Sequence, residues 1–421
     1  MVWHARGALG MNRLLRCLLG LLAPSVPLGV CSCGSSGGAT HGPSYGPDAG
    51  GTDALAVADA TNDVAGDVAS LADAPADTTE AGDDACTGAV AVVGGTVAGA
   101  STIAFGATLL QGGSWAVSSL ATNVGSPPAL AAVPGGFVAV FVDATGHLDY
   151  ATSSWSWSSP AAVAGVSAKG SPSLAGVGTT LHLVYQGTDG KYEHGTYTAG
   201  TGWDMANDPI GGATKQGFGP SAPVAASVAG DLLIAYGGQN GFVYDETWSA
   251  GAWAPDDEHA SATVELLSPA LVALQGGTSD ALIVYVAPDT TIHWTSRSAG
   301  AWSAPALVSA TAFTDASPSL APLSGGRAVM AFLGTNGLPY FSVYQPASTP
   351  PWSTPAAIAA STTALVSPPS VAPGVCGDDA VAALPEAAGV AVVRYAGGAW
   401  LSPTVLPGTA GMTYAAVATQ P

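Results

Sequence analysis

The amino-acid sequence predicts an all-β fold made of repeated four-stranded antiparallel sheets. Two sequence landmarks share one period: tryptophan recurs at residues 115, 157, 203, 253, 302, 352 and 400, and Ser-Pro or a close equivalent recurs once in each interval. The chain also contains 56 glycine and 31 proline residues among 421, which favours frequent turns over long helices. Intervals of 42 to 50 residues between the tryptophans suit one four-stranded unit each.

The segment from Ser268 to Val308 shows the expected layout of one unit. Residues 269–274 are predicted as a short apolar strand, and residues 281–286 form an apolar run of the kind found in strands covered on both faces. Residues 291–297 alternate in polarity, as a half-buried strand does, and a fourth strand begins at Trp302. Several units carry turn pairs that tolerate positive φ between their second and third strands: Asp189-Gly190, Asn240-Gly241 and Asn336-Gly337.

Units of this size that repeat radially form a β-propeller, since a lone meander leaves a face unburied. Residues 89–93 and 101–110 correspond to second and third strands, and no first strand precedes them. Residues 412–418 fall about one period after Ser367-Pro368, where a first strand belongs. We therefore expect a seven-bladed propeller over residues 86–421 whose C-terminal strand completes the first blade. A right-handed β-helix is the alternative, but its coils are shorter and contain no hairpins.

The first 33 residues are predicted to be an export signal. A basic start is followed by a short apolar stretch that ends at Pro24, which is too short to span a bilayer as a helix. Residues 28–33 resemble a bacterial lipobox, in which a cysteine after small residues is acylated. We expect lipidation at Cys33, with Cys31 as the alternative. The competing interpretation is an ordinary cleaved signal and a freely secreted protein.

Residues 34–85 are predicted to be a disordered acidic tether. Ten acidic residues lie from Asp48 to Asp84, with no lysine or arginine among them. A segment with so little apolar surface cannot offset the entropy of ordering. The whole chain carries a formal net charge of −20, and this sparse positive charge excludes a nucleic-acid partner because phosphate binding needs clustered Lys and Arg.

Two cysteines remain beyond the signal segment. Cys86 begins the first predicted blade and Cys376 lies in the seventh, so a closed ring makes them neighbours. An oxidising compartment favours a disulfide between them, which would act as a second clasp on the ring. Two separate thiols are the alternative.

One unit carries a family resemblance. The segment with Val184-Tyr185-Gln186, Asp189-Gly190, Glu193 and Gly202-Trp203 resembles the blades of propeller lectins that bind fucose and of related seven-bladed bacterial lectins. The resemblance covers residues 86–421 in architecture and is most detailed in this unit. It implies non-catalytic carbohydrate binding, with Glu193 at the position of the acid that accepts sugar hydroxyls. The arginine that the fungal family repeats is not repeated here.

Third strands supply the candidate ligand contacts. Sugar recognition needs aromatic faces and planar polar groups, and one side chain of these types follows the turn at the equivalent position of five units: Asp149, Glu193, Tyr244, His293 and Tyr340. The candidate set is completed by Tyr192, Trp294 and Arg297. The residues that directly follow the five third-strand residues are expected on the opposite face of the strand: Tyr150, His194, Asp245, Trp294 and Phe341. The alternative is that the five third-strand residues form solvated surface and the aromatic residues that follow them form core. The Gly-Trp landmarks are expected to pack between blades.

No catalytic pattern is predicted. The propeller arginines Arg297, Arg327 and Arg394 match no sialidase motif, and the histidines lack zinc-ligand spacing. We predict no catalytic residue, metal or cofactor. The sequence therefore favours an exported, lipid-anchored protein of the bacterial cell envelope, or an extracellular one if it is not anchored, that binds a glycan as a monomer. The alternatives are a surface scaffold without sugar affinity and a divergent sialidase-like glycosidase.

Overall fold

The computed structural model describes residues 88–96, 103–109, 115–122, 124–154, 156–210, 221–254, 257–263, 267–358, 363–375 and 379–420. In this part of the chain the secondary structure is β-strand, apart from one 3-10 turn at Ser324–Gly326, so the predicted all-β class is confirmed. No helix within these residues is long and apolar enough to cross a bilayer. The export signal, the tether, Cys31, Cys33, Cys86 and Cys376 lie outside the described residues, so the predictions about them stay predictions.

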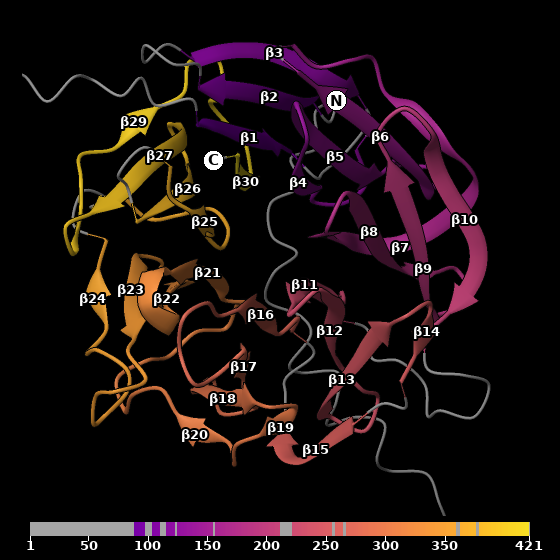
Figure 1. Cartoon of the computed structure of the whole chain (residues 1–421). Helices are drawn as coiled ribbons and strands as arrows, with labels where there is room; N and C mark the ends of the chain where they lie inside the picture. Colours follow the sequence, from indigo (N-terminus) through magenta and orange to yellow (C-terminus); the bar gives the residue numbers. More distant parts are fainter. Residues whose placement is uncertain are drawn as a thin grey trace, which may run out of the picture. The chain divides into compact units, whose positions relative to one another are not determined.

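The described strands form antiparallel sheets in which consecutive strands pair (Figure 1). The first sheet contains β3 (Trp115–Thr122), β2 (Ile103–Leu109), β1 (Ala89–Gly95) and β30 (Tyr414–Gln420). A larger sheet contains β4 (Ala129–Val133), β5 (Gly136–Val142), β6 (His147–Ser153), β7 (Ala161–Val177), β8 (Thr180–Gly187), β9 (Tyr192–Thr198) and β10 (Gly202–Pro209).

Four further sheets follow in chain order. They contain β11 (Val224–Val228), β12 (Asp231–Gly237), β13 (Phe242–Ser249), β14 (Ala252–Trp253) and β15 (Asp257–Thr263); β16 (Ala270–Ala273), β17 (Ala281–Val286), β18 (Ile292–Ser298), β19 (Ala301–Trp302) and β20 (Ala306–Leu307); β21 (Ser319–Leu323), β22 (Arg327–Leu333), β23 (Pro339–Tyr344) and β24 (Ala356–Ala357); and β25 (Ser370–Pro373), β26 (Ala380–Glu386), β27 (Gly389–Ala396), β28 (Ala399–Trp400) and β29 (Thr404–Val405).

The 17-residue strand β7 serves two meanders at once. Its first part pairs with β6, with Ala161 opposite Tyr150, and its last part pairs with β8, with Val177 opposite Thr180. Register shifts interrupt both pairings. The larger sheet therefore consists of two meanders that share one long strand.

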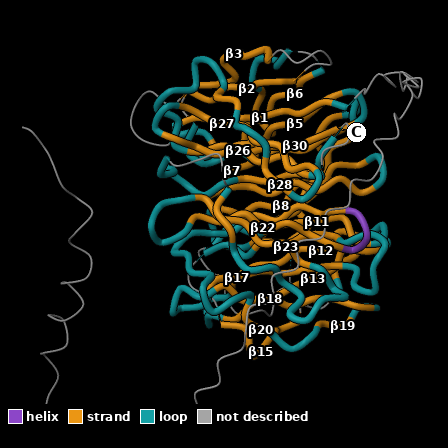
Figure 2. Tube along the Cα trace, turned by 90° about the vertical axis from the view of Figure 1, so that its left-hand side faces the viewer, coloured by secondary structure: helices purple, strands orange, loops and turns teal. Residues whose placement is uncertain are grey.

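The first strands of the meanders contact one another in chain order. The contacts run from β30 to β4, β7, β11, β16, β21 and β25, and then return to β30. Each meander continues outward from this set of strands (Figure 1), and Figure 2 shows the connecting loops at both ends of the strands. Every sheet itself stays open.

The two ends of the described chain meet in one sheet. Strand β30 pairs antiparallel with β1, with Val417 opposite Val92 and Tyr414 opposite Gly95. The predicted pairing of the C-terminal strand with the first unit is confirmed. Because β30 covers the edge of β1, that edge is not open to pairing with another chain.

A serine two or three residues after the landmark serine connects neighbouring first strands. In three places its Oγ accepts a hydrogen bond from a backbone N–H of the next first strand, at 3.0 to 3.2 Å. The pairs are Ser173 with Ala225, Ser319 with Val371, and Ser370 with Val417. These serines therefore supply a repeated contact between meanders.

The landmark tryptophans pack between meanders, as predicted. In four places one third-strand ring contacts two rings of the following meander, with centroids 4.9 to 6.4 Å apart. The sets are Tyr150 with Tyr197 and Trp203, His194 with Trp248 and Trp253, Trp294 with Tyr344 and Trp352, and Phe341 with Tyr395 and Trp400. This repeated three-ring contact explains the regular spacing of the tryptophans.

Candidate functional site

The five predicted third-strand residues occupy one register position in five hairpins. Each lies directly opposite an aromatic residue of the second strand, eight positions earlier in the chain. The pairs are Phe141 with Asp149, Tyr185 with Glu193, Tyr236 with Tyr244, Tyr285 with His293, and Phe332 with Tyr340. The hairpins lie in different meanders, so the structure presents these residues as separate positions and does not gather them into one site.

The hairpin from Phe332 to Tyr340 has the clearest local geometry. The two rings stack with centroids 5.7 Å apart and an interplanar angle of 23°. At the turn, Nδ2 of Asn336 donates to the hydroxyl of Tyr340 at 2.9 Å, while Oδ1 of Asn336 accepts from the backbone N–H of Leu338 at 3.1 Å. Gly334 leaves room for the tyrosine, because a Cβ there would lie 2.7 Å from its ring. The turn therefore fixes the Tyr340 ring beside its own polar end.

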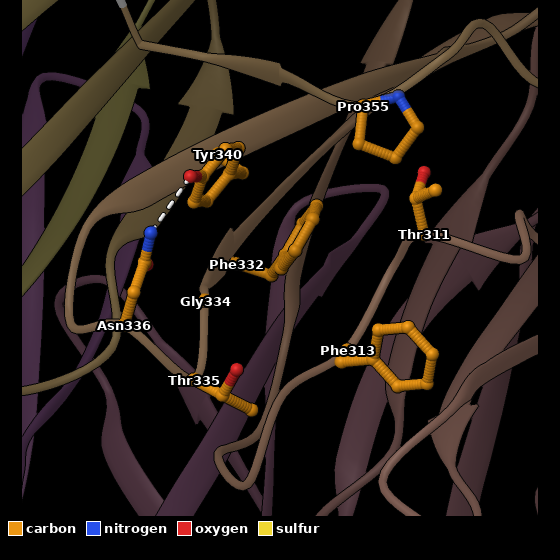
Figure 3. Close-up of a pocket in the computed structure, with 8 residues that line it drawn as sticks. All are labelled: Thr311, Phe313, Phe332, Gly334, Thr335, Asn336, Tyr340 and Pro355. Carbon is orange, nitrogen blue, oxygen red and sulfur yellow. Dashed lines mark hydrogen bonds between the residues drawn. The ribbon is translucent and has the colours of Figure 1, made fainter.

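A pocket of about 300 Å³ opens against this hairpin. Its opposite wall is the chain after β20, which places Thr311 and Phe313 across from the hairpin (Figure 3). Phe313 is 40% exposed and forms an isolated bridge with Thr291, which ties this wall to the preceding sheet. The pocket is lined by Thr311, Phe313, Phe332, Gly334, Thr335, Asn336, Tyr340 and Pro355.

The lining of this pocket, which we call the Tyr340 pocket, is neutral and mixed. Phe313, Phe332 and Tyr340 offer aromatic surface, Asn336 offers a planar amide, and Thr311 and Thr335 add hydroxyl groups. Apart from the phenol of Tyr340, no lining residue carries a titratable side chain. Such a lining suits a small neutral ligand that has one apolar face and several hydroxyl groups.

His293 and its turn form a hydrogen-bonded chain. The Thr291 hydroxyl donates to Asp289, and the His293 Nε2–H donates to the Thr291 oxygen at 3.0 Å. These bonds from Thr291 hold the pKa of the Asp289 carboxyl below its usual value. The imidazole also stacks on Tyr285, with centroids 5.6 Å apart. The turn therefore orients His293 as the amide turn orients Tyr340.

The two predicted acids lie in less open positions. Burial raises the pKa of the Asp149 carboxyl, and the nearby charge of Asp143 adds to the rise. Glu193 lies opposite Tyr185, whose pKa is raised to about 12, mainly by burial and further by the charges of Glu193 and Asp189. Glu193 therefore acts on a neighbouring group of its own hairpin, whereas Asp149 is acted on by burial and by Asp143.

Three predicted contacts are engaged with other residues of the protein. Tyr192 is fully buried, and its hydroxyl donates to the Ser221 carbonyl at 2.7 Å, so it is a core residue. Trp294 is one of the interlocking rings between meanders. Arg297 forms an ion pair with Asp280, with 3.9 Å between Nε and Oδ1. The assignment of these three residues as ligand contacts stays a prediction.

Of the predicted residues, the pocket contains Tyr340 alone. Sequence reasoning missed Phe332, Asn336 and Phe313. A signal existed for the first two, since an aromatic residue and a turn residue precede each third-strand candidate by eight and four positions in most units. Phe313 carries no such signal because it reaches the pocket from the connection between β20 and β21. Among the residues with described positions, no group of three or more His, Cys, Asp or Glu side chains is placed to hold a metal ion.

Comparison with solved structures returns lectins at low similarity. A structure of AofleA from Arthrobotrys oligospora is 14% identical, covers 70% of this chain and 90% of its own, and has a TM-score of 0.46. The lectin of Aleuria aurantia, described as a six-bladed β-propeller with a fucose recognition mode, is 16% identical over 67% of this chain and 97% of its own, with a TM-score of 0.44. The SapL1 lectin in complex with α-methyl fucoside is 12% identical over 68% and 99%, with a TM-score of 0.47. No protein-family model and no curated protein sequence matches the chain.

Proposed function

We propose that this protein is a non-catalytic carbohydrate-binding propeller of the bacterial cell envelope. It is exported, anchored through a lipidated Cys33 and monomeric, and it holds its binding unit on the acidic tether. The observation that carries the binding function is the Tyr340 pocket, where aromatic faces and a planar amide meet without a charged side chain. A neutral sugar fits this lining because its C–H face packs on rings while its hydroxyls bond to the amide.

The proposed blade number is seven. Two meanders share β7, and each of the other sheets supplies one meander, which supports this number. The cyclic contacts of the first strands and the pairing of β30 with β1 support a closed arrangement. In a ring of this kind, the proposed Cys86–Cys376 disulfide joins the first and last blades.

Sugar binding is tested by isothermal titration calorimetry with neutral methyl glycosides, including α-methyl fucoside. Thr335 is exposed at the rim of the pocket, so Thr335→Trp blocks it without touching the core. We expect the dissociation constant to rise about tenfold or more, which corresponds to a loss of about 1.4 kcal/mol or more. Gln239→Trp is the matched control, because Gln239 is the exposed residue at the same turn position in the β11–β15 sheet.

The outcomes separate the alternatives. Equal weakening by both variants would point away from the Tyr340 pocket. No binding to any glycan on an array at high protein concentration would favour the scaffold, and turnover of fluorogenic glycosides would favour the glycosidase.

Anchoring is tested by labelling cells with a palmitate analogue. Cys33→Ser is expected to abolish labelling, whereas Cys31→Ser is expected to leave it intact. The reverse result would move the lipidation site to Cys31, and no labelling of the wild-type protein would overturn the anchor.

A further inference from the structure

A second pocket, of about 400 Å³, lies against the sheet that contains β4, β5 and β6. We propose that it is a further binding site for a neutral saccharide, separate from the Tyr340 pocket. The two proposed sites bind the same class of ligand, but they have no lining residue in common.

We call the second pocket the Trp157 pocket. The Tyr340 pocket lies at the turn between the second and third strands of its meander, whereas the Trp157 pocket lies at the opposite end of a different meander. The Trp157 pocket is lined by the turn between the first and second strands, residues 133–137, and by the end of the third strand and the chain after it, residues 152–154 and 156–158. In a meander these two turns share one end, and the turn between second and third strands lies at the opposite end. Tyr197 and Ala199, from the end of β9, form the remaining wall.

The inner wall is built by close approach of neighbouring strands. Phe137 lies opposite Ser153 across β5 and β6, and Ser153 forms an isolated bridge with Trp157. Gly136 permits this approach, since a Cβ there would collide with the Ser153 carbonyl. Nε2 of Gln420 in the C-terminal strand donates to the carbonyl of Val133 on the rim at 3.1 Å. The wall is therefore held by backbone pairing within its own meander and by a side-chain hydrogen bond from β30.

Two polar groups at this wall have no partner among the described residues. Ser153 is 4% exposed, and its hydroxyl makes no hydrogen bond; the buried indole N–H of Trp157 likewise has no acceptor. Buried polar groups are nearly always satisfied, so a water or a ligand hydroxyl that reached this wall would supply the acceptors that these two donors lack. Several other landmark tryptophans share this feature. Trp157 differs because it lines a pocket together with an unsatisfied hydroxyl.

The lining favours a saccharide over a proline-rich peptide. Phe137, Trp157 and Tyr197 supply three aromatic rings, and no charged side chain lines the pocket. The rest of the lining is rich in hydroxyls: Thr152, Ser153, Ser154, Ser156 and Ser158. Hydroxyls both donate and accept, which matches a sugar that does the same. A proline-rich segment offers mainly acceptors, because proline lacks the backbone N–H.

The experiment uses the full-length chain with Thr335→Trp as background, so that the Tyr340 pocket is blocked. Calorimetric titrations with uncharged methyl glycosides and neutral disaccharides are compared for this background and for the same background carrying Ser156→Trp. Ser156 is exposed at the rim of the Trp157 pocket, so the indole fills the opening. Ala301→Trp is the matched control, because Ala301 is the exposed residue that precedes the landmark tryptophan in the β16–β20 sheet.

We expect the background to retain saccharide binding, Ser156→Trp to raise the dissociation constant about tenfold or more, and Ala301→Trp to change it less than about twofold. Ser153→Ala, which removes one unsatisfied donor, is expected to weaken binding several-fold without lowering the unfolding midpoint. If the wild-type chain binds a sugar and Thr335→Trp abolishes all binding, the Tyr340 pocket stands and the Trp157 pocket is overturned. Binding that survives Ser156→Trp also overturns it.

Discussion

Two interfaces between neighbouring meanders use the same positions for different chemistry. Where the β7–β10 strands meet the β11–β15 sheet, the third-strand ring is His194, and its centroid lies 4.9 Å from Trp248 and 5.3 Å from Trp253. Where the β21–β24 sheet meets the β25–β29 sheet, Phe341 occupies this position, with centroids 5.8 and 5.9 Å from the two equivalent rings. An imidazole and a benzene ring thus fill one structural slot.

The residues around His194 are also more polar than those around Phe341. At the first interface His182 Nδ1 lies 2.9 Å from His194 Nε2, and the Tyr236 hydroxyl donates to Glu246, which is 1% exposed. The second interface has only apolar residues at the positions equivalent to His182, Tyr236 and Glu246, namely Val329, Leu384 and Val393. The frame therefore tolerates a buried polar cluster at one interface, because the ring contacts and strand pairing are kept.

This difference in polarity predicts that the two interfaces respond differently to acid. The pKa of both His182 and His194 is lowered to about 4, by burial in each case and, for His182, also by the charge of His194. The folded protein therefore keeps these imidazoles neutral at a pH where the unfolded chain already protonates them. The apolar interface has no equivalent group, so acid should act on one interface and spare the other.

The largest expected effect is a cavity at the apolar interface. Trp400→Ala removes a buried ring packed on Phe341 and Tyr395. We expect the free energy of unfolding to fall by about 3–5 kcal/mol, by the same amount at pH 7 and at pH 5. Denaturant unfolding at both pH values measures this, and a pH-dependent loss would contradict the comparison.

The next effect is acid sensitivity at the histidine pair. Because the folded pKa values lie below the unfolded value near 6.5, the stability that the neutral pair contributes is present above about pH 6.5 and is lost as the pH falls toward 4. The expected loss is roughly 1–3 kcal/mol per imidazole, since one pKa unit corresponds to about 1.4 kcal/mol. Unfolding titrations from pH 7 to pH 4 measure it.

The control imports the residues of the other interface. The double variant His182→Val, His194→Phe should flatten the slope between pH 6.5 and 4 relative to wild type. An unchanged slope would assign the acid sensitivity to carboxyl groups elsewhere.

The reverse exchange is expected to be smaller. Phe341→His places an imidazole between Tyr395 and Trp400, where no second histidine can accept its hydrogen bond. We expect the free energy of unfolding to fall by about 1–2 kcal/mol at pH 7, because a polar group is buried without a partner. We also expect this variant to lose further stability on acidification, which the wild-type interface does not. Phe341→Leu serves as the control for lost ring contacts, and it should show the first loss without the second.

The smallest effect concerns a single hydrogen bond between first strands. Ser370→Ala removes the acceptor for the Val417 N–H, and we expect the free energy of unfolding to fall by about 1 kcal/mol. Ser319→Ala, at the same position between β21 and β25, should cost a similar amount. Thermal unfolding of both variants checks this, and a loss below the error of the measurement in both would remove the serines as a contact between meanders.

Much of the fold could be predicted because its signals are local. The Asn336-Gly337 turn and the apolar run at 281–286 each specify structure within a few residues, and the period made the end strand at Tyr414 recognisable. The long strand β7 escaped prediction, since its glycines indicate turns, whereas Gly165 and Gly170 take positive φ at the two register shifts and the strand continues through them.

The site was harder to predict because it depends on residues distant in sequence. Tyr340 was predicted from its strand position, but Phe313 meets it from the connection between β20 and β21, and only the packing of two meanders makes one pocket of them. His182 and His194 likewise become a pair through strand pairing, and nothing in their spacing of 12 residues marks it. Local pattern gives position along a strand, whereas the opposite wall depends on tertiary structure.

The pairing of β30 with β1 has a consequence for biogenesis. Strand β30 follows all the other described strands in the chain, so its pairing with β1 can form only after those strands have been synthesised. During synthesis β1 therefore waits for a partner that comes from the far end of the described chain, and its edge stays open until that partner arrives.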